Sequence, residues 1–190
     1  MKTIIVGLGN PGDQYYLSRH NLGFMFLDYL QKAQNLEPFV EKKKHKALVS
    51  ANSNVLLVKP QTFMNLSGEA AQSVCGYYCD QLDAVKDSIE KKLDNLIVVH
   101  DDLDLEFGSF KLQFGVGPRD HNGLLSIYHH LKTNSFWHLR VGADDRAGDR
   151  SIPVEKYVLQ PLSTEQQMQL PNLFEQMLQS LRIKKSELLS

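Results

Sequence analysis

The sequence lacks several features that would assign it to a specialised class of protein. It has only two cysteines among 190 residues, Cys75 and Cys79, and these cannot form a disulfide framework or a four-ligand zinc site. It has no run of about 18 apolar residues that could span a membrane, and no internal repeat or low-complexity segment. The apolar stretch at the N-terminus is interrupted by glycine too early to be the core of a signal peptide. These absences favour a globular protein without membrane contact, and we expect a reducing, cytoplasmic location.

Charge of one sign is not in excess either. The chain has 21 Lys and Arg against 22 Asp and Glu, a net charge of −1. Composition therefore gives no support to a strongly basic nucleic-acid binder, and any contact with RNA needs a local patch. Hydrophobic residues make up 42% and charged residues 23% of the chain, which is ordinary for globular proteins and excludes disorder, collagen and coiled coils. The length predicts one domain over residues 1–190.

Apolar runs that end at turn residues predict an alternation of strands and helices. We expect strands at 3–8, 46–51, 54–59 (ended by Pro60), 96–99, 109–114 and 136–142. We expect helices at 21–33, from Thr62 or Asn65 to about 78, at 123–132, and from Ser163 onward with a break near Pro171. Between them we expect a helix or linker over 80–94, an acidic turn at 100–104, and loops at 115–120 and 143–151. The pattern predicts a single α/β domain with a mixed, mostly parallel, twisted sheet flanked by helices.

The segment Gly7-Leu-Gly-Asn-Pro-Gly12 matches the G-x-G-x-x-G pattern of dinucleotide-binding proteins. That function needs a helix to begin within the turn, so that its N-terminus faces the pyrophosphate. Here Pro11 lies inside the motif and no clean helical stripe follows it. The other interpretations are a tight turn without function, or a turn that presents Asn10 at the carboxyl end of a strand, where ligands meet α/β sheets. We favour the last.

Polar residues gather at the ends of the predicted elements. They are Asn10, His20, Asn65, Asp101 and the pair His121-Asn122. A neutral histidine accepts a proton from water, a carboxylate behind it fixes its tautomer, and asparagine amides stabilise a developing oxyanion. The set predicts hydrolysis of an acyl bond by water, since no Gly-x-Ser-x-Gly motif supplies a serine nucleophile.

Two other interpretations concern the histidines. His20, His121 and Asp101 have the composition of a metal-binding set of two histidines and a carboxylate. Their spacings match no compact metal signature, so we expect no metal. We interpret His45, His129 and His130 as exposed residues of a loop and a helix.

Several motifs taken together resemble the bacterial-type peptidyl-tRNA hydrolases. The chain opens with Gly7-Leu-Gly-Asn-Pro-Gly12, Tyr15 and Ser18-Arg-His-Asn21, and continues with Lys59-Pro-Gln-Thr-Phe-Met-Asn-Leu-Ser-Gly68. Asp101-Asp-Leu-Asp-Leu105, His121-Asn-Gly-Leu124, Leu139-Arg-Val-Gly142 and Tyr157-Val-Leu159 follow in the order of that family. The resemblance spans about residues 3–160, and several motifs in order are more specific than any one of them.

The resemblance implies an enzyme that cuts the ester between a peptide and the 3′ end of tRNA, and so recycles tRNA from aborted translation. It implies a three-layer α/β fold, action as a monomer, no metal or other cofactor, and contact with the acceptor stem and 3′ end of peptidyl-tRNA. By resemblance, His20 is the general base, Asp101 rather than Asp102 orients it, and Asn10 holds the substrate. The same resemblance assigns Tyr15, Met64, Asn65, His121 and Asn122 to substrate binding, and Lys111 and Arg140 to tRNA phosphates.

Two loops depart from the family pattern. Residues 115–120 read Gly-Val-Gly-Pro-Arg-Asp where the family has a nearly continuous glycine run. Residues 143–149 read Ala-Asp-Asp-Arg-Ala-Gly-Asp, which adds acid beside a surface expected to attract phosphate. These departures motivate a second hypothesis, a non-catalytic relative that binds RNA or a partner on the same fold.

Overall fold

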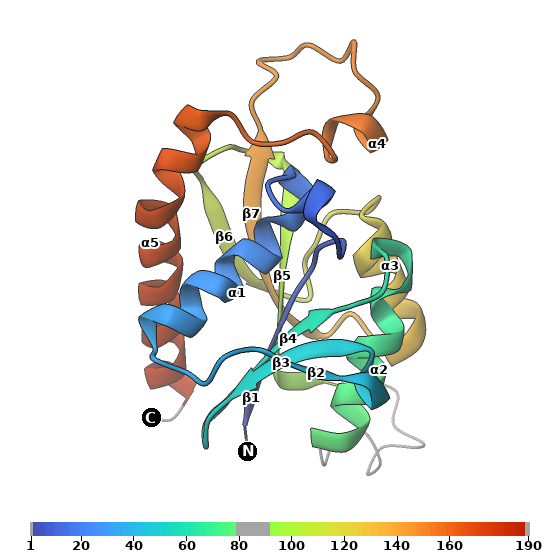
Figure 1. Cartoon of the computed structure of the whole chain (residues 1–190), viewed down its shortest axis with the longest axis vertical. Helices are drawn as coiled ribbons and strands as arrows, with labels where there is room; N and C mark the ends of the chain where they lie inside the picture. The colour runs from blue at the N-terminus through green and yellow to red at the C-terminus, as the bar shows by residue number, and fades with distance from the viewer. Residues whose placement is uncertain (1, 79–91, 189–190) are drawn as a thin grey trace.

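A computed structural model describes residues 2–78 and 92–188 and arranges them around one seven-stranded sheet (Figure 1). The sheet order is β2-β3-β4-β1-β5-β7-β6. The strands are β1 (Thr3–Gly7), β2 (Val40–Lys42), β3 (Ala47–Ala51), β4 (Val55–Pro60), β5 (Leu93–Glu106), β6 (Phe110–Phe114) and β7 (Phe136–Asp144). The central strands β4, β1, β5 and β7 pair in parallel, whereas the pairings at both edges are antiparallel. The prediction of a mixed sheet in an α/β domain is confirmed.

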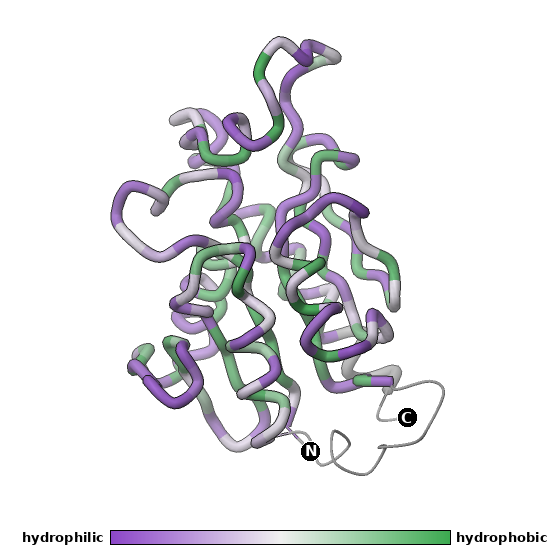
Figure 2. Tube along the Cα trace, turned by 90° about the vertical axis from the view of Figure 1, so that its right-hand side faces the viewer, coloured by the Kyte–Doolittle hydropathy of each residue, from purple (hydrophilic) through white to green (hydrophobic). Residues whose placement is uncertain are grey.

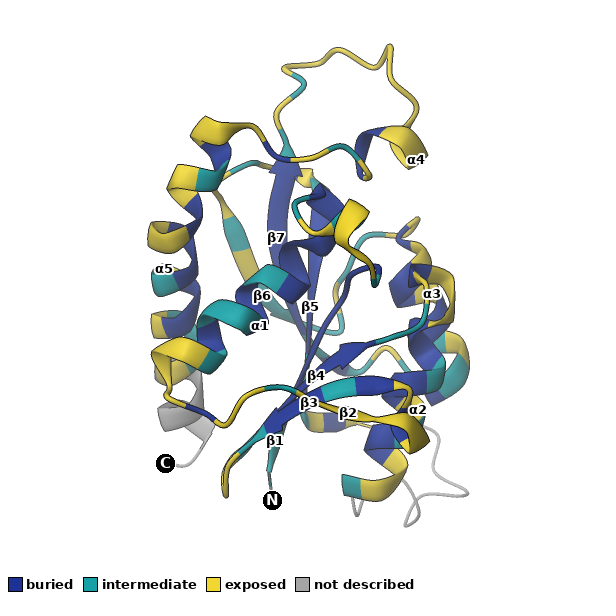
Figure 3. Ribbon diagram, in the orientation of Figure 1, coloured by how far each residue is buried: buried dark blue, intermediate teal, exposed yellow. Residues whose placement is uncertain are grey.

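Helices cover both faces of the sheet, which gives three layers. Helices α1 (Leu22–Ala33) and α5 (Thr164–Leu188) lie on one face, and α2 (Ser67–Tyr78) and α3 (Asn122–Leu131) on the other (Figure 1). Short helices connect these elements: η1 (Asp13–Tyr15), η2 (Arg19–Asn21), η3 (Lys43–His45), η4 (Met64–Leu66) and α4 (Val154–Tyr157). Helix α5 turns its buried side toward the sheet and its exposed side outward (Figure 3). No helix in the described ranges is both long enough and apolar enough to cross a membrane.

The alternation of side chains along the strands divides the hydrophobic core in two. In β1, Val6 packs into the cluster under α2 and α3, whereas its neighbour Ile5 packs against α1 and α5. On the second side the rings of Phe26 and Phe174 meet edge to face, with centroids 5.5 Å apart. Burying a side chain as large as Phe26 contributes about 1.5–3 kcal/mol. Figure 2 shows the hydrophobic residues concentrated in the central strands and the inner sides of the helices.

The expected acidic turn at 100–104 is wrong. These residues continue β5, which runs unbroken from Leu93 to Glu106 and pairs in parallel with β7. The carboxylates of Asp101 and Asp102 are buried inside the sheet layer, and each is paired with cationic or N–H-bearing side chains. A stretch that reads as a turn by composition is therefore a central strand.

Other boundaries also differ from the predictions. Pro60 is the last residue of β4 rather than the residue after it, and Pro171 lies inside α5 without ending it. Leu170 and Phe174 are buried on either side of this proline, so packing holds the helix together. The exposed edge strand β2 was not predicted. His45 is buried rather than exposed, and His130 is half-buried. Cys79 and the predicted helix or linker up to residue 91 lie outside the described residues.

The glycine-rich start has a packing role. A Cβ added to Gly7 would lie 2.5 Å from the carbonyl oxygen of Gly23, and one added to Gly9 would lie 2.6 Å from the ring of Phe24. Only glycine allows β1 and α1 to approach so closely. Gly12 adopts a φ of +105°, which glycine tolerates. The turn leads into the three-residue η1, and α1 begins only at Leu22, so the helix does not begin within the turn as dinucleotide binding requires.

Candidate active site

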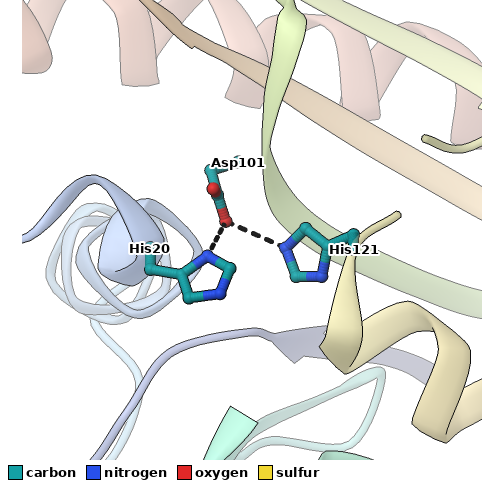
Figure 4. A group of neighbouring side chains, drawn as sticks. All are labelled: His20, Asp101 and His121. Carbon is teal, nitrogen blue, oxygen red and sulfur yellow. Dashed lines mark hydrogen bonds and ion pairs between the residues drawn. The ribbon is translucent and has the colours of Figure 1, made fainter. Parts of the chain in front are cut away.

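Two histidines converge on one buried carboxylate at the carboxyl end of the parallel strands. His20, in η2, donates its Nδ1–H to Oδ1 of Asp101 over 2.8 Å, and His121 donates its Nε2–H to the same oxygen over 2.9 Å. Figure 4 shows the two rings on either side of Asp101. The sequence alone did not decide between Asp101 and Asp102, and the geometry pairs Asp101 with His20.

The charge of Asp101 sets the protonation of His20. Burial alone would raise the pKa of Asp101, but His20 and His121 hold it far below its ordinary value, so the carboxylate is ionised at neutral pH. Burial disfavours the imidazolium form of His20, but the charge of Asp101 and the hydrogen bond to it outweigh burial. The pKa of His20 is therefore raised above its ordinary value of 6.5. Because Nδ1–H is held by Asp101, Nε2 is the nitrogen left to accept a proton.

His121 is fixed in one neutral tautomer. Its ring caps α3, where Nδ1 accepts hydrogen bonds from the backbone N–H groups of Gly123 (3.2 Å) and Leu124 (3.4 Å). Since Nδ1 accepts and Nε2–H donates to Asp101, neither nitrogen is left to take a proton from a substrate or water. His121 therefore serves as a neutral donor to Asp101.

Asp102 points to the opposite face of β5, as successive side chains in a strand do. Its Oδ2 accepts a hydrogen bond from Nε of Arg140 in β7 over 2.7 Å, and both side chains are almost fully buried. Nη1 of Arg140 donates to Oε1 of Gln113 over 2.8 Å. The guanidinium that was predicted to meet tRNA phosphate is thus held by two side chains of this protein.

Asn10 is held in place by two neighbours. Asn21 was expected to cap α1 through its side chain, but its amide instead bonds to the backbone N–H and carbonyl of Asn10, at 2.8 Å and 2.9 Å. The backbone N–H of Met64 donates to Oδ1 of Asn10 over 2.8 Å. Because Oδ1 is already an acceptor, the amide of Asn10 is oriented with Nδ2 as its remaining donor.

These side chains line one large cavity of about 1310 Å³. Among the predicted site residues, the lining includes Asn10, His20, Met64, Asn65, Asp101, His121, Asn122 and Arg140. Tyr15, half-buried in η1, and Lys111, exposed on β6, do not belong to it. The cavity therefore unites most of the predicted cluster and leaves out two of its members.

Sequence reasoning missed other residues of the cavity wall. They are chiefly Phe63, Val158, Leu159 and the arginines 119, 146 and 150. Four of the six arginines of the chain line this cavity, counting Arg140. Acidic side chains, among them Asp104, Asp120 and Glu155, share the same walls. Arginines in two glycine-bearing loops were the signal in the sequence that could have pointed to this part of the wall.

Two acids at the end of β7, Asp144 and Asp145, are paired with arginines within the protein. Asp144 accepts from Nε of Arg146 over 2.7 Å and from Nη1 of Arg150 over 2.8 Å, and these bonds hold its pKa well below the ordinary value. Asp145 pairs with Arg19 over 3.0 Å. Two of the three acids in residues 143–149 are therefore paired with arginines, and Asp149 is exposed.

A metal ion could be held by the same three side chains, since the ligand atoms of His20, Asp101 and His121 lie within 4.8 Å of one another. In the structure, however, each of these nitrogens directs its N–H at Oδ1 of Asp101, so hydrogen bonds account for the arrangement. What the geometry can do chemically is remove a proton from water at Nε2 of His20.

Comparison with known proteins agrees with this geometry. The sequence profile of the peptidyl-tRNA hydrolase family matches residues 4–188. The peptidyl-tRNA hydrolase of Lawsonia intracellularis is 43% identical over 180 residues, which cover 92% of this chain and 82% of the relative. That of Nitrosomonas europaea is 40% identical over 167 residues, covering 86% and 78%. The crystal structure of peptidyl-tRNA hydrolase from Acinetobacter baumannii superposes with a TM-score of 0.76 at 28% identity, covering 92% of this chain and 83% of that one. The chain therefore belongs to the peptidyl-tRNA hydrolase family.

Proposed function

We propose that this chain hydrolyses the ester bond between the peptide and the tRNA of peptidyl-tRNA, using a water molecule that His20 deprotonates. One observation carries the mechanism. His20 is braced by Asp101 at 2.8 Å through Nδ1 and borders a cavity large enough for the end of a substrate. Members of this family cut the ester of peptidyl-tRNA. The alternative of a non-catalytic relative on the same fold is not favoured.

The proposed reaction uses groups in the cavity wall. Nε2 of His20 takes a proton from water as the water oxygen attacks the ester carbonyl carbon. Asp101 stabilises the imidazolium that forms, and the side-chain amide of Asn10 donates to the oxygen that becomes negative. The tetrahedral intermediate collapses, the bond to the ribose oxygen breaks, and the imidazolium returns its proton to that oxygen. The products are a peptide with a free carboxylate and a tRNA with a free 3′ end.

Other polar groups of the cavity suit the two halves of the substrate. Asn65 and Asn122 are exposed at the cavity wall. Their amides can both donate and accept, as the backbone of a peptide of any sequence requires. Met64 offers an apolar contact beside them. We assign these three residues to binding of the peptide and the terminal nucleotide.

The tRNA body is expected to contact the arginines at the rim and Lys111 on β6. Phosphate contacts of this kind give affinity without sequence specificity and weaken as salt rises. Arg140 is paired with Asp102 and Gln113, so we assign it a share of the local positive potential rather than a flexible contact. The acceptor stem and 3′ end are the parts of the substrate that such a surface beside the cavity would meet.

We further propose that the chain works as a monomer in the cytoplasm, without metal or other cofactor. The hydrogen bonds among His20, Asp101 and His121 supply an activated base without a metal ion. Light scattering at assay concentration measures the oligomeric state, and a dimer that loses activity on dilution would overturn the monomer.

Release of tRNA from N-acetyl-aminoacyl-tRNA tests the proposed reaction. His20→Ala should reduce the rate by at least about 10²–10⁴-fold, because the general base is lost. His129→Ala, which removes an exposed histidine of α3, is the matched control. Equal rates for wild type and His20→Ala would refute the mechanism. Tight RNA binding without turnover by the wild type would support the non-catalytic alternative instead.

A further inference from the structure

The residue before the proposed base is itself buried, and both terminal nitrogens of its guanidinium donate hydrogen bonds. The side chain of Arg19 is only 7% exposed. Its Nη2 donates to both carboxylate oxygens of Asp145, at 3.0 Å and 3.1 Å, and its Nη1 donates to the carbonyl of Pro161 over 3.1 Å. Taking a guanidinium out of water is costly unless its donors are satisfied. An arginine so placed therefore holds several segments together.

Those segments include a strap, residues 157–162, that crosses above η2 on its way from α4 to α5 (Figure 1). The backbone N–H of His20 donates to the carbonyl of Val158 over 2.9 Å, and that of Arg19 to the carbonyl of Gln160 over 3.2 Å. Leu162 returns a bond from its N–H to the carbonyl of Leu17 over 2.8 Å. The short helix that bears the base is thus hydrogen-bonded along its backbone to the strap.

Asp145 ties this strap to the end of β7. The hydroxyl of Tyr157, the first residue of the strap, donates to Asp145, and the guanidinium of Arg19 lies 4.5 Å above the Tyr157 ring. Gln166, in the first turn of α5, donates to Asp145 over 2.6 Å. Burial would raise the pKa of Asp145, but Tyr157 and Arg19 lower it, so the carboxylate stays charged and the pair is complete. Four separate segments therefore meet at one ion pair.

The strap is also part of the reaction chamber. Val158 and Leu159 line the cavity, and Val158 is the residue that holds the backbone of His20. A shift of the strap would move both the cavity wall and the base. Misplacing a reacting group by about 1 Å can cost about 10²-fold in rate.

We propose that Arg19 and Asp145 are positioning residues of the hydrolytic reaction, whose ion pair locks η2 to the strap and so holds the His20 imidazole against Asp101. This inference rests on the proposed function for its kinetic test. It also gives a role to one of the loop acids that depart from the family pattern. Asp145 precedes Arg146, which lines the cavity, and the charge of Asp145 is balanced by Arg19.

The test compares two isosteric changes that remove one negative charge from the same loop. Asp145→Asn removes the partner of Arg19, whereas Asp149→Asn alters an exposed acid that accepts a hydrogen bond from the backbone N–H of Ser151. We expect Asp145→Asn to lower kcat by about 10-fold to 100-fold with little change in KM. We expect Asp149→Asn to leave kcat unchanged. Arg19→Lys should recover part of the activity lost in Arg19→Gln, because it keeps the charge.

A second readout separates positioning from loss of folded protein. The charged and titratable groups that face the His20 ring are Asp101 and His121. NMR titration of the His20 imidazole should give a lower pKa in Asp145→Asn than in wild type, because the ring moves away from the carboxylate that raises it. A destabilised but correctly positioned variant would keep the wild-type value. An unchanged His20 titration, or equal losses of kcat in the two loop variants, would overturn the inference. The NMR result needs no turnover, so it stands apart from any failure of the proposed function.

Discussion

Acid should weaken this protein through a histidine that takes no part in the proposed reaction. His138, in β7, is 0% exposed and stacks on the ring of Phe136 with centroids 4.6 Å apart. Burial is the main reason that its pKa falls from 6.5 to about 4. In the unfolded chain the same ring takes up a proton near pH 6.5. Between these two values the unfolded state binds more protons, so the free energy of unfolding falls as the pH falls.

The size of this effect follows from the gap between the two pKa values. Each pKa unit is worth about 1.36 kcal/mol, so His138 should account for a loss of about 3 kcal/mol between pH 6.5 and pH 4. Above pH 6.5 its contribution is constant. That loss is a large share of the stability of an ordinary domain, about 5–15 kcal/mol. Replacing His138 with a residue that does not titrate should remove this part of the pH dependence.

The test is urea unfolding of wild type and His138→Gln, followed by circular dichroism at a series of pH values. It gives the free energy of unfolding of each protein at each pH. The free energy of unfolding should fall less steeply in the variant, by about 3 kcal/mol in total over this interval. His100 is also buried and resists protonation, mainly because of burial, and it is present in both proteins. His129→Gln, at an exposed position, should leave the wild-type slope intact. Parallel curves for wild type and His138→Gln would refute the reasoning.

Three further predictions concern the proposed reaction and its substrate. Asp101→Asn should lower kcat by about 10⁴-fold with a small effect on KM, because the imidazole loses the carboxylate that orients it and stabilises its charge; unchanged kcat in a tRNA-release assay would contradict the pairing. In the wild type the same assay should show activity rising with pH through a pKa above 6.5, since only neutral His20 accepts a proton. Lys111→Ala should reduce the slope of log affinity against log salt by about one, whereas Lys32→Ala, at the end of α1, should not; equal slopes in a filter-binding assay would exclude Lys111 from phosphate contact.

The strands that could be predicted from the sequence are made largely of apolar residues, and such a run indicates a buried strand by itself. Residues 3–8 and 54–59 are largely apolar because both faces of a central strand are covered by helices. The acidic end of β5 instead has the composition of an exposed turn. Asp101 and Asp102 are tolerated inside the sheet only because His20, His121 and Arg140 satisfy them, and those partners are distant in sequence. Local composition cannot report contacts of that kind.

The residues of the proposed site also divide into those that the sequence indicated and those that only the structure brought together. His20 and Asp101 are 81 positions apart, and only the resemblance to a family paired them before the structure did. Asn21 is a residue type that often caps helices, but its side chain instead forms hydrogen bonds with the backbone of Asn10. Arg19 and Asp145 were not singled out as a pair, because nothing near either residue reveals an ion pair across 126 positions.

The pleat of β5 has a consequence for the variation that this chain can tolerate. Deleting one residue just upstream, with the pairing to β1 kept, would bring Asp102 to the side of His20 and set Leu103 opposite Arg140. A carboxylate would still be available to the imidazole, but a buried guanidinium would lose its counter-charge, a change that costs about 3–5 kcal/mol in comparable cases. We expect single-residue insertions and deletions to be excluded from this strand, while the loops around the cavity accept them.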